Sequence, residues 1–171
     1  MSQKKISSEK REEPVDQARP QVFTLEVVLI GGPITERFAA KNPSVSRTIK
    51  IRGDQTLEEL HYAIFDAFGR DDEHMYQFQF GKKPMDRNGA NYVTPFGFDP
   101  FDDNTAGCVD ETTLDSLGLK VKRKFFYWFD FGDDWWHEIR VEAIDNKVAT
   151  GKFPRVTKRV GKSPPQYAHY E

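Results

Sequence analysis

The alternation of apolar and polar positions predicts β-strands in five stretches of this chain. Most are rich in β-branched or aromatic side chains, and several end at glycine or proline, as the run before Gly31-Gly32-Pro33 does. The five stretches are residues 22–30, 45–51, 75–80, 124–130 and 136–144. The last two are separated by a short Gly- and Asp-containing segment, which predicts a hairpin.

A single main helix is predicted between the second and third strands. Thr56 and Glu59 have the spacing of a capping box, in which each side chain bonds the backbone N–H of the other residue. Apolar residues follow at helical spacing as far as Phe68, and Gly69 stands where a left-handed C-terminal residue is expected. His61 is the polar member of this apolar stripe.

The order of elements predicts an α+β protein, because one apolar helix stripe needs one apolar sheet face. We expect a mixed sheet with one main helix packed across it, in a ubiquitin-like β-grasp arrangement with a long insert at residues 81–113. A plainer antiparallel α+β sandwich is the alternative. Residues 21–145 then form a single domain, between a disordered tail at 1–20 and a basic, extended or disordered tail at 146–171.

The strand at 124–130 is apolar on both faces, and one helix can cover only one of them. Phe126 and Trp128 lie on the second face, and Trp136 on the returning strand joins them as candidate binding residues. An exposed aromatic face of this kind marks an interaction surface. The alternative is that aromatic residues of the insert, or the C-terminal tail, cover this face; the insert residues are Phe96, Phe98 and Phe101.

A second candidate site combines imidazole and carboxylate groups. His61 on the helix stripe and His137 on the inward strand face, with Asp133 or Asp130 from the hairpin, are ligand types that bind zinc and other divalent ions. The alternative is that both histidines are hydrogen-bonded residues of the core edge and the aspartates are turn residues. No cofactor is otherwise expected, and a divalent metal stays possible.

Composition and charge limit the partners. The 171 residues carry a formal net charge of −2, so the global balance does not favour nucleic acid or an anionic membrane. The basic tail from Lys147 to Lys162 leaves a local contact with nucleic acid as a weaker alternative. Cys108 is the one cysteine, which favours a reducing, cytoplasmic location, and no apolar run is long enough to span a membrane.

Three motifs carry a resemblance to a known family. Residues 57–61, 73–78 and 127–139, the last with its Phe-Gly-Asp-Asp-Trp-Trp-His run, resemble the pRi plasmid open-reading-frame-three-like family. Its members are largely uncharacterised, and some are labelled as passengers of plasmids or insertion elements. The resemblance therefore implies a fold more than a function.

Two departures from the family pattern are visible. Gly69-Arg70 stands where members often have Gly-Trp, and residues 163–167 lack the two cysteines of a Cys-Pro-Pro-Glu-Asp-Cys stretch. Any metal or redox role of those thiols is therefore not carried over to Ser163 and Tyr167.

The leading functional hypothesis is a non-catalytic protein-interaction module that binds a protein partner or a second copy of itself. The aromatic face or the 81–113 insert would make the contact. The rival is a metal-dependent hydrolase of phosphoester or similar bonds that uses His61, His137 and Asp133. Whether the protein is an enzyme stays open, although no catalytic motif favours it.

Overall fold

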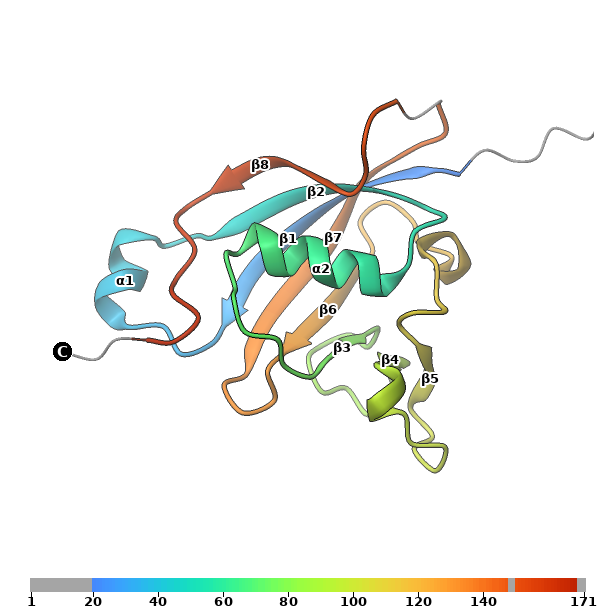
Figure 1. Cartoon of the computed structure of the whole chain (residues 1–171), viewed down its shortest axis with the longest axis horizontal. Helices are drawn as coiled ribbons and strands as arrows, with labels where there is room; N and C mark the ends of the chain where they lie inside the picture. Colours follow the sequence, from blue (N-terminus) through green and yellow to red (C-terminus); the bar gives the residue numbers. More distant parts are fainter. Residues whose placement is uncertain (1–19, 148–149, 169–171) are drawn as a thin grey trace, which may run out of the picture.

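A computed structural model describes residues 20–147 and 150–168, which form one eight-stranded sheet with a helix across one face (Figure 1). The strand order is β5-β4-β3-β6-β7-β1-β2-β8. The strands are β1 (Val22–Gly31), β2 (Ser46–Arg52), β3 (Tyr76–Gln79), β4 (Asn91–Val93), β5 (Thr105–Cys108), β6 (Lys124–Phe129), β7 (Trp135–Asp145) and β8 (Arg155–Val160). The helices are α1 (Glu36–Lys41), α2 (Leu57–Ala67) and the 3-10 turns η1 (Pro95–Gly97) and η2 (Leu114–Leu117). The predicted α+β class is confirmed.

Helix α2 is the predicted main helix, and its start has the predicted physical cause. Thr56 and Glu59 form the capping box, with Glu59 Oε2 accepting from the Thr56 backbone N–H at 2.8 Å. Its apolar stripe, including Leu60 and Ile64, is buried against the sheet. Gly69 follows with φ 63°, a conformation that glycine adopts without steric cost.

The centre of the sheet is antiparallel. β1 lies between β2 and β7 and runs antiparallel to both, while β6 pairs with β7 as the predicted hairpin. Among the described strands, the parallel pairing is that of β4 with β5, so the sheet is mixed. The specific ubiquitin-like β-grasp arrangement is not confirmed.

The sheet is wider than predicted, because both its edges come from segments in which no strand was predicted. The insert at 81–113 contributes β4 and β5 beyond β3, and β8 pairs with β2 at the other edge. The sheet therefore continues past residue 145, where the sequence places the end of the domain. The predicted disordered tail at 1–20 lies outside the described residues except for Pro20.

The two faces of the sheet differ in what covers them, because α2 packs on one of them, the helix-side face, and not on the other, the outer face. The helix-side face carries the buried residues of β6 that point toward α2, such as Phe125 and Tyr127. The outer face carries the alternate residues, Phe126 and Trp128. No helix in the described part of the chain is both long enough and apolar enough to cross a membrane.

Candidate functional site

A pair of stacked tryptophans lies on the outer face. Trp128 of β6 and Trp136 of β7 are cross-strand neighbours, with ring centroids 5.1 Å apart and planes within 5°. Phe131 packs at 4.1 Å from Trp128, and the indole N–H of Trp128 donates to Asp134 Oδ1 at 2.9 Å. Both tryptophans are half-buried, whereas Phe126, the third predicted binding residue, is buried. The surface open to a partner here is therefore the tryptophan pair with Phe131.

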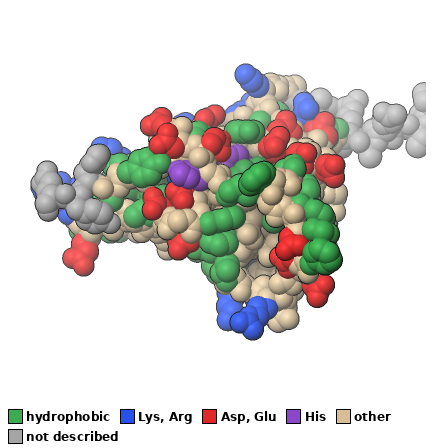
Figure 2. All heavy atoms as spheres, turned by 60° about the horizontal axis from the view of Figure 1, so that its bottom comes forward, with side chains coloured by type: hydrophobic (Ala, Val, Ile, Leu, Met, Phe, Trp, Pro, Cys, Tyr) green, Lys and Arg blue, Asp and Glu red, His purple; other side chains and the backbone are tan. Residues whose placement is uncertain are grey.

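The phenylalanines of the insert are exposed rather than folded over the sheet. Phe96 and Phe101 are each 92% exposed, and Phe98 is 47% exposed. The idea that these rings cover the second sheet face is therefore wrong. In Figure 1, β3, β4 and β5 lie at the bottom of the view. Figure 2 turns this side toward the viewer and shows hydrophobic side chains gathered on it.

Backbone and side-chain hydrogen bonds hold the phenylalanine loop, residues 94–104, in a defined conformation. Thr94 Oγ1 accepts from the Gly97 N–H at 3.2 Å and caps η1. Asp99 Oδ1 accepts from the Phe101 N–H at 2.9 Å, and a second aspartate, Asp102, makes the equivalent bond to the Asn104 N–H at 3.0 Å. The apolar rings are thus displayed by an ordered, acidic loop.

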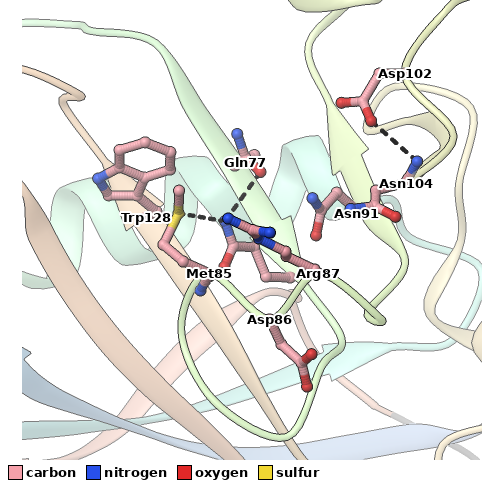
Figure 3. A pocket seen from close by; sticks show the side chains of 9 residues that line it. Gln77, Met85, Asp86, Arg87, Asn91, Asp102, Asn104 and Trp128 are labelled. Carbon is pink, nitrogen blue, oxygen red and sulfur yellow. Dashed lines mark hydrogen bonds between the residues drawn. The ribbon is translucent and has the colours of Figure 1, made fainter.

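Between the tryptophan pair and this loop lies a cavity of about 430 Å³ on the outer face (Figure 3). Its floor is made by Trp128 and by Gln77 and Gln79 of β3, and loop residues such as Met85 and Asp102 form its walls. The sequence analysis gave these two glutamines no role. Their alternation with Tyr76, Phe78 and Phe80 was the available signal.

The predicted metal ligand His61 lies under the sheet, buried, with both ring nitrogens engaged. Its Nδ1 lies 2.6 Å from the Tyr127 hydroxyl and its Nε2 lies 3.1 Å from Glu73 Oε2. Its ring stacks on Tyr76 at 3.6 Å. Burial first and the nearby Arg70 cation second lower the pKa of His61 to about 3. The Glu73 carboxylate would favour the charged ring, but it is half exposed and screened by water, so it does not offset them. His61 is neutral at pH 7, so Tyr127 O–H donates to Nδ1 and Nε2–H donates to Glu73.

The second predicted ligand, His137, is also fully buried. Its Nδ1 donates to the Tyr127 carbonyl at 3.2 Å, so its Nε2 is free to accept from Arg70 Nη2 at 2.9 Å. Burial, with the Arg70 charge, lowers the pKa of His137 well below its usual range. A guanidinium cation therefore occupies the lone pair that a metal ion would need.

Arg70 itself was missed by sequence reasoning as a core residue. The guanidinium is buried and lies over the rings of Phe68, Phe129 and Trp135, with centroid distances of 5.2, 5.1 and 4.9 Å. Its Nη1 and the Trp135 indole N–H are buried without a hydrogen-bond partner among the described residues. The chain departs from the family pattern at this residue, which was the available signal.

The hairpin aspartates serve the turn. Asp130 has φ 59°, and its Oδ1 accepts from the backbone N–H groups of Gly132 and Asp133 at 3.1 and 3.2 Å. Its Oδ2 lies 3.4 Å from His74 Nε2. Within residues 20–147 and 150–168, no three His, Cys, Asp or Glu side chains are grouped as a metal site. The structure therefore does not bring His61, His137, Asp133 and Asp130 together.

The basic tail is placed on the sheet edge. Arg155, Lys158 and Arg159 are exposed on β8, which pairs with β2. Arg155 lies over the Phe153 ring at 4.6 Å. Contact of this edge with nucleic acid stays a prediction.

These features define an α+β protein with a helix on one side of its sheet and an open, aromatic and carboxamide-rich surface on the other. The chain matches the family described as plasmid pRiA4b ORF-3-like protein over residues 37–167, and it belongs to that family. The resemblance inferred from the three sequence motifs is thereby confirmed.

Two similar proteins have no described function. The chain is 26% identical over 127 residues to the uncharacterized protein y4hQ of Sinorhizobium fredii (strain NBRC 101917 / NGR234), covering 72% of this chain and 59% of that protein. The crystal structure of MM3350, a protein of unknown function from Methanosarcina mazei Go1, superimposes with a TM-score of 0.63 at 22% identity. That match covers 86% of this chain and 73% of the other, and it shows a shared fold.

Proposed function

We propose that this protein is a non-catalytic interaction module that binds a protein partner through the phenylalanine loop and the adjacent tryptophan pair. The observation that carries the proposal is the 92% exposure of both Phe96 and Phe101 on a loop held by its own hydrogen bonds. Exposed aromatic groups clustered on one surface mark protein-binding sites, and Phe, Trp and Tyr are enriched at the centres of such contacts.

The charges beside these rings indicate what kind of partner would fit. Asp99, Asp102 and Asp103 lie within the same loop, and no salt bridge joins any of them to a basic side chain in the described part of the chain. A partner with an apolar pocket framed by Lys or Arg would bury the rings and place opposite charges around them. A second copy of this chain is the other possible occupant.

The test compares capture of a partner by three forms of the full chain. Phe96→Ser/Phe101→Ser removes the exposed rings, and Tyr62→Ser/Val121→Ser removes two other exposed apolar side chains as a matched control. We expect a cross-linked complex with the wild type and the control, and at least about tenfold less with the loop variant, since two anchors are lost. Sedimentation over a wide concentration range distinguishes self-association.

Equal capture by all three forms, or a strict monomer that captures no protein, would overturn the proposal. The metal-dependent hydrolase is not favoured, because the ring nitrogens of His61 and His137 are already bonded within the core.

A further inference from the structure

The cavity on the outer face has a built-in arrangement of uncharged hydrogen-bonding groups. Its floor runs across three neighbouring strands, because Trp128 pairs with Gln77, and Gln79 pairs with Asn91. Figure 3 places Trp128 on one side of the cavity and Asn91 and Asn104 on the other, with Gln77 between them. The indole of Trp128 thus lies opposite carboxamides that come from separate elements.

Gln79 fixes the orientation of Gln77. Its Nε2 donates to Gln77 Oε1 at 3.1 Å and to Met85 Sδ at 3.5 Å, while its Oε1 accepts from the Met85 N–H at 2.8 Å. Gln79 is therefore engaged at both ends of its amide and buried. Because Gln77 Oε1 already accepts from Gln79, the Gln77 Nε2 is the end left to donate to a ligand.

The other carboxamides of the cavity are also available. Hydrogen bonds in this region use the backbone N–H groups of Asn91 and Asn104, and within the described residues their side-chain amides have no partner. Each carboxamide offers both a donor and an acceptor. The groups exposed to the cavity therefore match a ligand whose own groups both donate and accept.

The charged groups around the cavity disfavour an anionic ligand. Asp86 and Asp102 line it together with one cation, Arg87. Hydrogen bonds from the backbone N–H groups of Asn88 and Lys82 lower the pKa of Asp86, which keeps this carboxylate ionised. A phosphate would meet two carboxylates against one guanidinium, so a nucleotide is a poor fit.

We infer that this cavity binds one uncharged, polyhydroxylated ring, the chemistry of a monosaccharide unit. The apolar C–H side of such a ring packs on Trp128, whose face carries the negative part of its quadrupole. The hydroxyl groups around its edge bond to Gln77 Nε2 and to the carboxamides of Asn91 and Asn104. Walls formed by the segments around Met85 and Asp102 suit a single ring better than an extended peptide.

The inference goes beyond the proposed function and does not depend on a protein partner. Its test titrates the full-length protein, labelled with ¹⁵N, separately with glucose, galactose, mannose and N-acetylglucosamine. Their unbranched oligosaccharides form a second arm, which distinguishes a free monosaccharide from the end of a glycan. We expect shifts confined to the side-chain amides of Gln77, Asn91 and Asn104 and to the Trp128 indole N–H.

Variants decide whether the shifts come from this cavity. Gln77→Met should weaken binding about tenfold, since the loss of one or two hydrogen bonds is worth about that factor. Gln21→Met, a carboxamide replaced immediately before β1, should leave binding unchanged, because Gln21 does not line the cavity. Phe96→Ser/Phe101→Ser should still bind the sugar, which distinguishes this site from the protein-binding one.

Three results would overturn the inference. The first is an absence of shifts with every sugar and oligosaccharide. The second is a sugar response that Gln77→Met leaves intact, which would place the ligand elsewhere. The third is a response of these amides to adenosine but to no sugar, which would assign the cavity to an uncharged heterocycle instead.

Discussion

The two faces of the sheet use polar residues in opposite ways. On the helix-side face, His61, Tyr127, His137 and Arg70 are buried and bonded to one another, and both histidines are uncharged. On the outer face, the cavity carboxamides have groups left free for a ligand, and nearby phenylalanines are exposed. The residue types that suggested chemistry in the sequence thus serve packing, while the open surface is built from Gln, Asn, Trp and Phe.

The largest loss of stability is expected for a substitution at His137, and it tests whether the polar residues of the helix-side face stabilise the fold. His137→Ala removes the acceptor for Arg70 Nη2 and leaves a buried cation without its hydrogen-bond partner. It also removes the edge-on contact with Phe68, whose ring centroid lies 5.0 Å away. We expect the free energy of unfolding, measured in urea, to fall by about 3–5 kcal/mol.

His74→Ala is the matched control, because the His74 side chain is 36% exposed and bonds at the surface to Asp130 and Tyr167. Its loss should cost less than about 1 kcal/mol. Equal losses for the two variants would mean that the helix-side network contributes no special stability.

The next effect is a dependence of stability on pH. The pKa of His61 is about 3 in the folded protein, against 6.5 for an unperturbed histidine, and that of His137 is also depressed. Between these values the unfolded chain binds more protons than the folded one, so stability is full above pH 6.5 and is lost as the pH falls. Between pH 7.5 and pH 5.5, each histidine should lower the free energy of unfolding by about 1.4 kcal/mol, and the two together should lower it by about 3 kcal/mol.

Urea unfolding at the two pH values measures this dependence. His61→Gln should remove about half of it, because one of the two buried titrating groups is gone. A stability that stays flat or rises toward pH 5.5 would show that the histidines are charged in the folded state, and the neutral network described here would be wrong.

Features that depend on neighbouring residues in the sequence were predicted, and features that depend on contacts between distant segments were missed. The capping box at Thr56 and the β6–β7 hairpin rest on short spacings, and both were predicted. β8 and the β4–β5 edge were not, because a short strand with a polar sequence is stabilised by the strand it pairs with, here β2 for β8. The cavity was missed for the same reason, since its lining residues are separated by up to about fifty positions and meet only in the sheet.

The two histidines illustrate the opposite failure. His61 and His137 were correctly placed on inward-facing positions. The departure from the family pattern marks Arg70 as unusual, but it does not indicate that this residue turns into the core and takes the lone pair of His137. The alternative of hydrogen-bonded core histidines describes both residues as they lie. A metal role for Asp130 and Asp133 has no support from the geometry of the turn.

The smallest change in stability is expected for substitutions in the phenylalanine loop, because its rings are exposed whereas the polar residues of the helix-side face are buried. Phe96 and Phe101 are almost fully exposed, so replacing both with serine removes little buried apolar area from the folded protein. The loop keeps its η1 cap and its aspartate bonds, because these use Thr94 and Asp99 and not the rings. We expect the free energy of unfolding to change by no more than about 0.5 kcal/mol, as for surface positions in general. A loss of about 2 kcal/mol or more would mean that these rings pack within the molecule, and the docking surface would then have to be sought at Trp128 and Trp136 alone.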